Sequence, residues 1–337
     1  MEPFTLGEAL EILRGGEDLS SHEVVSLFDH LLKNNDAAQW TAILSALAIK
    51  GESIEEVVGV AMWLRQKMTP ISLPNTYDKR VVDCCGTGGD QMSTFNISTL
   101  AAIIATTGDV PIVKHANRSA SGNFGSIDLL EAINIPFAQN SAQAVSLLTR
   151  HNIVFLDAPS FHPALKKLSK IRKLLGIPTT FNLAAPLANP AYVEKQMIGV
   201  WESALVPFIA EVALELGADS GMTVCGNGLD EFSTLDMNEY ARIDAQGVEL
   251  NKYNPSRLTL HSASESDLVC AARQDYIEKA MKVINGVRCP ESDIVALNAG
   301  AIFYLDGTVK SIDEGFALAE NIILSGKVKE KVESMRL

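Results

Sequence analysis

The chain has 337 residues, and its 28 Lys and Arg against 41 Asp and Glu give a formal net charge of −13 with the histidines neutral. Nonspecific binding of DNA or RNA depends on cationic side chains that neutralise phosphates, so this balance argues against a nucleic-acid-binding protein. Hydrophobic residues make up 47% and charged residues 20%, which excludes a disordered or fibrous chain and is typical of a globular one.

Nothing in the sequence predicts a membrane or secreted protein. No uncharged apolar run approaches the roughly 18 residues that a membrane span requires. The acidic N-terminus is not followed by the apolar segment that a signal peptide needs. The five cysteines, at positions 84, 85, 225, 270 and 289, have no Cys-x-x-Cys spacing, so we expect reduced thiols and a cytoplasmic location.

Four short helices are predicted in the first 70 residues. Three pairs have the spacing in which a hydroxyl and a carboxylate cap the first helical turn reciprocally: Thr5 with Glu8, Ser20 with Glu23, and Ser53 with Glu56. Apolar residues recur behind each pair every three or four positions, and Asp36 opens a further stretch of this kind. Such stripes without an interleaved strand indicate a small bundle, which rests on another part of the molecule or forms a dimer surface.

From residue 81 onward, short apolar runs alternate with helical patterns. The runs lie at residues 81–85, 112–113, 153–156 and 222–224, and the helical patterns at 94–107, 126–132, 142–149 and 204–216. This alternation predicts a mostly parallel sheet with helices on both faces. The last part of the chain returns to helix, notably at 293–305 and 312–324. Residues 69–74, with prolines at both Pro70 and Pro74, are the best candidate for a hinge.

A glycine-rich turn follows the first predicted strand. Gly86, Gly88 and Gly89 lie between that strand and a helix start at residues 94–99. Glycines let a backbone approach an anion closely, and a helix N-terminus adds partial positive charge, so the segment predicts a phosphate cradle. A tight turn without a ligand is the alternative. Neither the P-loop spacing nor the dinucleotide-binding glycine spacing is present.

Polar and cationic residues follow the second predicted strand. Lys114, His115, Asn117 and Arg118 come directly before or within a loop of small residues that ends at Gly122. Two cations, an imidazole and an amide at the C-terminal end of a strand are what a highly charged ligand needs. A solvated loop is the alternative. The preceding strand directs this loop toward the same sheet edge as the glycine turn.

Two adjacent carboxylates, Asp230 and Glu231, follow a short apolar run and a glycine turn farther along the chain. Hard carboxylate oxygens near phosphates are apt ligands for Mg²⁺. Such a pair in isolation is more often solvated surface. The prediction of a magnesium site therefore depends on all three motifs occurring together.

Seven motifs resemble, in order and spacing, those of the anthranilate phosphoribosyltransferases, and the resemblance covers essentially the whole chain. They are residues 86–90 (Gly-Thr-Gly-Gly-Asp), 95–99 (Phe-Asn-Ile-Ser-Thr), 114–118 (Lys-His-x-Asn-Arg), 162–164 (His-Pro-Ala), 181–183 (Phe-Asn-Leu), 186–190 (Pro-Leu-x-Asn-Pro) and 228–231 (Gly-Leu-Asp-Glu).

The resemblance implies an α/β fold with a small N-terminal helical domain hinged to a larger domain whose mostly parallel sheet is flanked by helices. We expect the helical domain at residues 1–72, with a later helical segment near 161–190 packing at the hinge, and the phosphoribosyl-binding domain at 73–337. The implied reaction transfers the 5-phosphoribosyl group from PRPP to the amine of anthranilate and releases pyrophosphate, within tryptophan biosynthesis. A homodimer through the helical domain is also implied.

The resemblance also implies the site residues. PRPP would be held by the glycine turn, the helix start and the loop after the second strand: Gly86, Gly89, Asp90, Thr94, Asn96, Ile97, Ser98, Thr99, Lys114, His115, Ala116, Asn117, Arg118, Ser119, Ala120, Ser121, Gly122 and Ser126. Anthranilate would contact Gly86, Asn117, His162 and Arg172, whose guanidinium can grip a carboxylate with two hydrogen bonds. Two Mg²⁺ ions are implied, one shared by Ser98 and Glu231 and one held by Asp230 and Glu231.

Catalysis in such a site would consist of positioning and electrostatic stabilisation around an oxocarbenium-like ribose carbon. We nominate no general base, and for His115 we favour a positioning or hydrogen-bonding role over proton transfer.

The sequence departs from the family's pattern on the acceptor side. Ala116 replaces Gly, Lys170 replaces Pro, Ala184-Ala185 replaces Leu-Gly, and Cys225 stands where His is usual. A methyl group at position 116 is expected to narrow the aromatic slot or disturb a backbone of positive φ. Two alternatives stay open: a phosphoribosyltransferase of the same fold with another aromatic acceptor, and a non-catalytic paralogue that binds nucleic acid.

Overall fold

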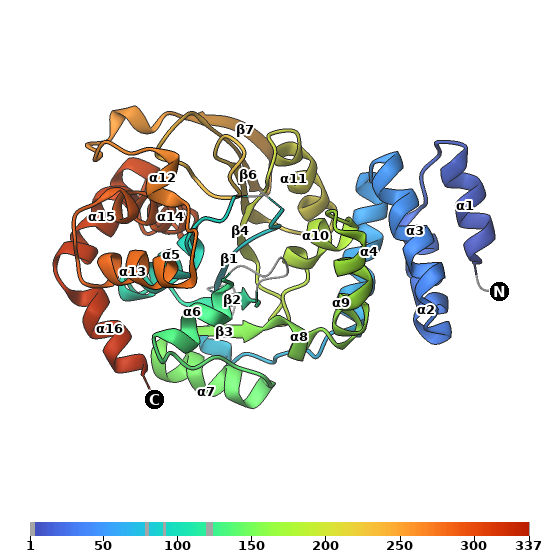
Figure 1. Ribbon diagram of the computed structural model, residues 1–337, viewed down its shortest axis with the longest axis horizontal. Helices are drawn as coiled ribbons and strands as arrows, with labels where there is room; N and C mark the ends of the chain where they lie inside the picture. The colour runs from blue at the N-terminus through green and yellow to red at the C-terminus, as the bar shows by residue number, and fades with distance from the viewer. Residues whose placement is uncertain (1–3, 78–80, 90–91, 119–123, 337) are drawn as a thin grey trace.

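The computed structural model describes residues 4–77, 81–89, 92–118 and 124–336. A bundle of N-terminal helices lies at one end of the molecule, and a sheet with the C-terminal helices lies at the other (Figure 1). This arrangement confirms the predicted fold class. Within the described residues, no helix is both long enough and apolar enough to cross a membrane.

Residues 6–67 form the four predicted helices, and each begins where its cap was predicted. These helices are α1 (Leu6–Arg14), α2 (Ser21–Asn34), α3 (Ala37–Lys50) and α4 (Ile54–Lys67). Reciprocal capping boxes are present at Thr5, Ser20 and Ser53, and the Asp36 side chain accepts a hydrogen bond from the Ala38 amide. Such caps satisfy backbone donors that a helix start otherwise leaves without partners.

The bundle core contains a ring cluster to which a residue from a distant segment contributes. Phe28 packs edge-on against Trp40 and Trp63, with ring centroids 5.0 and 5.4 Å apart. Phe181, from α10 (Thr180–Ala184), lies 5.8 Å from Phe28 and 6.2 Å from each tryptophan ring. The four rings are fully or almost fully buried, so α10 is joined to the bundle by close aromatic packing.

The strands of the described residues form one seven-stranded sheet in the order β3-β2-β1-β4-β5-β6-β7. The pairs from β3 to β5 are parallel, and β6 and β7 add an antiparallel hairpin at one edge. The strands are β1 (Val82–Gly86), β2 (Ile112–Ala116), β3 (Ile153–Asp157), β4 (Lys195–Gly199), β5 (Ser220–Cys225), β6 (Asn238–Asp244) and β7 (Gly247–Tyr253). The mostly parallel sheet was predicted, whereas β4, β6 and β7 were not.

The helices after the bundle cover both faces of the sheet and the end remote from the bundle (Figure 1). They are α5 (Ile97–Thr107), α6 (Ser126–Ala132), α7 (Ser141–His151), α8 (Ala158–Phe161), α9 (Pro163–Leu175), α10, α11 (Leu205–Glu215), α12 (Glu265–Leu268), α13 (Arg273–Ile284), α14 (Pro290–Asp306), α15 (Ile312–Leu324) and α16 (Lys327–Met335), with short 3₁₀ turns η1 (Asn75–Tyr77), η2 (Ala185–Leu187) and η3 (Pro255–Arg257). Every helical pattern predicted from the sequence falls within or overlaps one of them.

Strand alternation divides the site residues between the two faces of the sheet. Successive side chains of a strand point to opposite faces. In β2, Ile112 belongs to the core formed with α5 and α14, whereas Val113 belongs to the core formed with α7 and α8. Lys114 therefore points toward the face of α5, and His115 points toward the opposite face.

Candidate active site

The glycine turn after β1 has the conformation that its glycines permit. Gly88 and Gly89 have φ of +63° and +92°, a region that residues with a Cβ rarely adopt. The Gly88 amide donates a hydrogen bond to Asp230 Oδ2 over 2.9 Å, so the turn faces the predicted acidic pair. Asp90, which was predicted beside this turn, lies outside the described residues.

Close packing holds the loop of Asp230 against the ends of β1 and β4. A Cβ placed on Gly86 would overlap the Asp230 carboxylate, and one placed on Gly199 would overlap the Asp230 carbonyl group. Both glycines are therefore required for the loop to approach this closely. Gly86 was predicted as a site residue, but the equally restricted Gly199 was not.

The first turn of α5 points at the other member of the acidic pair. The Ser98 amide donates to Glu231 Oε1 over 3.1 Å. Asn96, just before the helix, donates through Nδ2 to the Phe124 carbonyl, while its Oδ1 is buried without a hydrogen-bond partner among the described residues. Ile97 and Thr99 are buried, and Thr94 forms an isolated bridge with Val269. The helix start thus supplies amides and one buried acceptor to the same region as the turn.

Asp230 and Glu231 are two acids crowded together in a poorly solvated place. Burial and the neighbouring Asp230 charge raise the pKa of Glu231 to about 8, and burial raises the pKa of Asp230. Among the described residues, no Lys, Arg or His forms an ion pair with either carboxylate, although the buried Lys114 acts on both through its charge. Such a pair fits a divalent cation, which prefers carboxylate oxygens and would neutralise both charges.

Asn298 of α14 fixes the backbone directly after this pair. Its Oδ1 accepts from the Phe232 amide over 2.9 Å, and its Nδ2 donates to the Phe232 carbonyl over 2.8 Å. Asn298 is fully buried, so these bonds do not compete with water. The position of the acidic pair is thereby tied to the longest helix among the described residues.

At the end of β2, Lys114 lies near the acidic pair, whereas Asn117 and Arg118 bond to residues of α6. Lys114 Nζ donates to the Cys84 carbonyl over 2.6 Å and lies near the acids. Asn117 and Ser126 are joined by two hydrogen bonds, of 3.0 and 3.2 Å. Arg118 forms ion pairs with Asp128 and Glu131 of α6. The predicted Ser119, Ala120, Ser121 and Gly122 lie outside the described residues.

Ala116 does not produce the strain expected of a methyl group at this position. It ends β2, is not among the residues of positive φ, and is 2% exposed within the core beside α5. An extended backbone accepts any side chain, and the methyl group packs into the apolar core instead of opposing a left-handed turn.

Arg172 is a half-buried cation that lacks a carboxylate partner among the described residues. Its Nη2 donates to Asn182 Oδ1 over 3.3 Å, and its guanidinium carbon lies 5.9 Å from the centre of the Phe181 ring. Burial lowers the pKa of Arg172. Asn182 in turn donates to the Thr87 carbonyl over 3.2 Å, so one amide side chain links Arg172 to the glycine turn.

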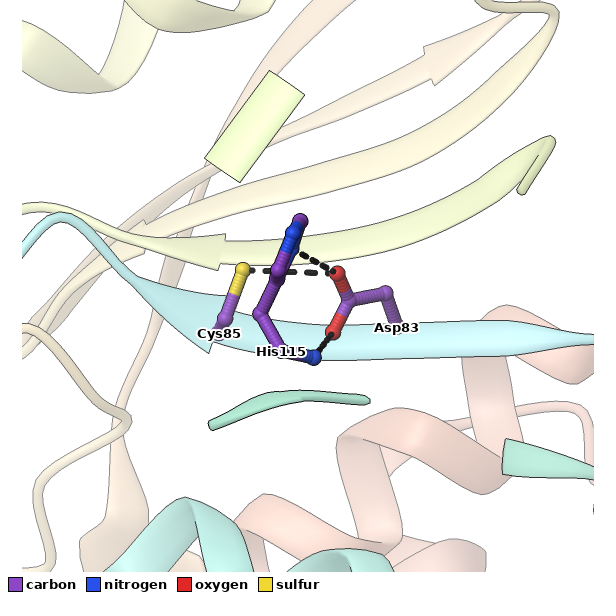
Figure 2. Close-up of side chains that lie close together, drawn as sticks. All are labelled: Asp83, Cys85 and His115. Atoms are coloured by element: carbon purple, nitrogen blue, oxygen red, sulfur yellow. Dashed lines mark hydrogen bonds and ion pairs between the residues drawn. The ribbon is translucent and has the colours of Figure 1, made fainter. Parts of the chain in front are cut away.

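A third polar cluster lies on the sheet face opposite Lys114. Asp83, Cys85 and His115 have ligand atoms within 4.8 Å of one another (Figure 2). The two Asp83 oxygens already accept from the His115 amide, the His115 ring, Asn189 and the Cys85 thiol. Since burial raises the pKa of Cys85 well above its usual value, its sulfur is a thiol. We therefore interpret the cluster as a hydrogen-bond network and not as a metal centre, because its carboxylate oxygens already accept hydrogen bonds and its sulfur is protonated.

Two asparagines of this site, Asn182 and Asn189, had no role assigned from sequence. Both lie in quoted motifs, but nothing in their spacing indicates which backbone groups they bind. Asn189 donates both to Asp83 and to the Val113 carbonyl, over 2.8 and 2.9 Å. The sequence feature that could have pointed to them is that each asparagine lies inside one of the quoted motifs, in a segment that is otherwise apolar.

Comparison with known proteins covers nearly the whole chain. Residues 7–68 match the helical bundle domain of a glycosyl transferase family, and residues 78–329 match the α/β domain of that family. The anthranilate phosphoribosyltransferase of Acetivibrio thermocellus is 36% identical over 330 residues, which are 97% of this chain and 95% of that protein.

Two solved structures of the Saccharomyces cerevisiae anthranilate phosphoribosyltransferase are also similar. One, in complex with PRPP and Mg, has a TM-score of 0.87 and 27% identity, and the match covers 98% of this chain and 96% of that one. The other, in complex with 4-fluoroanthranilate, has a TM-score of 0.84 and 26% identity, with coverage of 98% and 97%.

Proposed function

This chain belongs to the family of the anthranilate phosphoribosyltransferases, and we infer that it transfers the 5-phosphoribosyl group of PRPP to the amine of anthranilate, releasing pyrophosphate in tryptophan biosynthesis. One observation carries this inference within the structure. The half-buried Asp230 and the buried Glu231 contact the glycine turn and the first turn of α5, respectively, and no described cation forms an ion pair with them.

The PRPP side of the site comprises the turn, the start of α5 and Lys114. The turn and the helix start supply backbone amides, which suit the phosphate and pyrophosphate oxygens of the substrate. Lys114 adds a buried positive charge, and the unpartnered Asn96 Oδ1 supplies an acceptor for a ribose hydroxyl. Asn117 and Ser126, which hydrogen-bond to each other, extend this surface on the β2 side.

Magnesium is the cation that the acidic pair would hold. We assign two ions, one to Ser98 and Glu231 and one to Asp230 and Glu231. When bound, Mg²⁺ neutralises the charge that develops on the leaving pyrophosphate. The raised pKa values of both acids support this assignment, because the attraction of a cation would offset the cost of burying both charges and the repulsion that Glu231 meets from Asp230.

The acceptor side comprises Arg172, His162, Asn117 and Gly86. A half-buried guanidinium that bonds, among the described residues, to one amide and one ring keeps donors for the carboxylate of anthranilate. The hydrogen bonds that link Arg172 through Asn182 to Thr87 support a carboxylate site near the glycine turn. Side chains of this chain then orient the amine toward the ribose carbon, so positioning supplies much of the rate.

We further assign the chain to homodimers formed through the helical domain and to the cytoplasm. Two exposed apolar side chains, Ile49 of α3 and Leu174 of α9, support the dimer assignment, since these helices pack together and both side chains are more than four-fifths exposed. All five cysteines are free, which suits a reducing compartment.

Calorimetric titration of the protein with PRPP, with and without Mg²⁺, tests the PRPP assignment. We expect binding that depends on Mg²⁺, and turnover when anthranilate is added, followed by pyrophosphate release. The absence of Mg²⁺-dependent binding would contradict the proposal for the PRPP side. Turnover with other aromatic amines but not with anthranilate would contradict the acceptor.

A further inference from the structure

A line of hydrogen bonds runs from a buried carboxylate through two imidazoles. Asp83 Oδ2 lies 3.3 Å from His115 Nδ1, and Figure 2 shows the two side chains facing each other. His115 Nε2 lies 3.0 Å from His162 Nε2. Asp83 is fully buried, and His162 is 3% exposed. The order Asp83, His115, His162 therefore leads from the interior of the sheet toward its C-terminal edge.

The chemistry of these groups determines where each proton lies. Burial opposes ionisation of Asp83, but the hydrogen bond from His115, the electrostatic attraction of His115 and Lys114, and the hydrogen bond from Asn189 together lower the Asp83 pKa, so Asp83 is a carboxylate. A carboxylate only accepts hydrogen bonds, so His115 must carry its proton on Nδ1. When His115 is neutral, its Nε2 is an acceptor, and His162 then carries its proton on Nε2.

The remaining nitrogen of His162 is left with a free lone pair. Its Nδ1 is buried and has no hydrogen-bond partner among the described residues. Buried polar atoms without a partner are uncommon, and one at a site edge calls for a ligand. Burial and the adjacent His115 lower the pKa of His162 to about 3, so the ring is neutral and its lone pair is available.

His162 lies between two elements at the proposed acceptor side of the site. His162 follows α8 at the end of β3 and directly precedes α9, the helix that carries Arg172. His115 lies one residue before the end of β2, on the sheet face opposite Lys114. Resting on the proposed function, we propose that His162 Nδ1 accepts the proton released by the acceptor amine, while Asp83 and His115 fix its tautomer and share the charge.

Bond formation at C1 of the ribose releases one proton, and His162 receives it. The amine lone pair forms a bond to C1 of the ribose, and the bond from C1 to the pyrophosphate oxygen breaks, with its electrons leaving on pyrophosphate. The proton of the now cationic amine passes to His162 Nδ1. The Nε2 proton of His162 can pass to His115 Nε2, where Asp83 stabilises the resulting imidazolium. His162 is the catalytic residue, and Asp83 and His115 are positioning residues.

The test combines kinetics with nitrogen NMR on the full chain. For His162→Asn, the single-turnover rate with anthranilate should fall about 100-fold or more, while the KM for PRPP changes by less than about threefold. Asp83→Asn should lower the rate by at least about tenfold, because an amide donor reverses both imidazole tautomers. Cys85→Ser, which keeps a donor to Asp83, is the matched control and should retain the rate within about threefold.

The NMR measurement does not require a folded variant. In the wild-type protein, the Nδ1 of His162 should give the signal of an unprotonated ring nitrogen and that of His115 the signal of a protonated one. The charged group that faces the His115 ring is Asp83, which also accepts from the Cys85 thiol and Asn189 and is acted on by the charge of Lys114. A protonated His162 Nδ1 in the wild type would overturn the proposal.

Retention of the wild-type single-turnover rate by His162→Asn would also overturn it. Failure of the proposed function gives a different result, because the wild-type protein itself would then not turn over anthranilate.

Discussion

Arg172 carries a half-buried guanidinium whose partners among the described residues are one amide oxygen and one aromatic ring. Replacing it with Ala should raise the KM for anthranilate by about 10- to 100-fold, because a charge-assisted contact to the carboxylate is lost. The KM for PRPP should change little, since Arg172 reaches the glycine turn only through Asn182. Initial rates at varied concentrations of each substrate measure both constants.

Lys173→Ala provides the control for Arg172. It removes a cation from the neighbouring position of α9, but its side chain is exposed, so both KM values should stay near those of the wild type. Equal increases of the two KM values in Arg172→Ala would place Arg172 in general packing and not in carboxylate recognition.

The buried neutral His162 predicts a loss of stability in acid. Its pKa is about 3 in the folded protein and near the ordinary value of 6.5 in the unfolded chain. Between these values the unfolded state binds more protons, so the free energy of unfolding falls as the pH drops from about 6.5 toward 3. Between pH 7 and pH 4, the free energy of unfolding of His162→Asn should therefore fall by about 3 kcal/mol less than that of the wild type.

Urea unfolding at several pH values measures this difference. His22→Asn is the control, because His22 is exposed on α2 and its substitution should leave the pH profile parallel to that of the wild type. Parallel profiles for His162→Asn and the wild type would show that His162 charges as readily in the folded protein as in the unfolded chain.

At the scale of elements, the loop that carries the acidic pair depends on α14. Asn298→Ala removes both hydrogen bonds to Phe232 and leaves a buried amide and carbonyl without partners. This should lower the free energy of unfolding by about 2–4 kcal/mol and weaken Mg²⁺-dependent PRPP binding. Urea unfolding and calorimetric titration measure the two effects.

Asn321→Ala tests whether the effect of Asn298→Ala is specific. Asn321 is exposed on α15, the helix packed against α14, so its substitution should change stability by less than about 0.5 kcal/mol. A destabilised Asn298→Ala protein with unaltered PRPP binding would show that the acidic loop is held independently of α14.

The elements that the sequence predicted best are those whose signals are local. Each bundle helix carries its own cap, and strands β1, β2, β3 and β5 are apolar runs buried within the sheet. β4 was missed because Met197 and Ile198 are followed at once by glycine, which gives too short a run. β6 and β7 form an edge hairpin, where half-exposed side chains weaken the apolar pattern.

The parts of the site that backbone groups form could be predicted from the sequence. The side-chain hydrogen bonds that join distant segments could not. Positive φ at Gly88 and Gly89 follows from residue type and spacing. The bonds of Asn182 to Thr87 and of Asn189 to Asp83 join residues 95 and 106 positions apart, and no local pattern specifies such partners. The assignments of ligand contacts remain predictions that the variants above address.

Across the whole molecule, the segments that connect bundle and sheet lie side by side. The Thr69 amide donates to the Phe161 carbonyl, and the Ile71 amide donates to the Pro190 carbonyl, each over 2.8 Å. We propose that residues 1–72 and the segment 161–190 form one body and that the rest of 73–337 forms the other. Opening at this group of connections would separate Arg172 from the glycine turn, since each belongs to a different body.

Phe181 is the residue through which this division can be tested. It packs among the bundle rings and supports Arg172, whereas Phe303 is equally buried in the core beside α5. Each Phe→Leu substitution should lower the free energy of unfolding by about 1–3 kcal/mol. Only Phe181→Leu should also raise the KM for anthranilate, by about tenfold, because it shifts Arg172 relative to the turn.

Steady-state kinetics and urea unfolding of both variants decide the matter. Because both substitutions should lower the free energy of unfolding by similar amounts, a difference in the KM for anthranilate reflects which of the two bodies is perturbed. If Phe303→Leu raised the KM for anthranilate as much as Phe181→Leu, acceptor binding would respond to overall stability, and the bundle would have no separate part in placing Arg172.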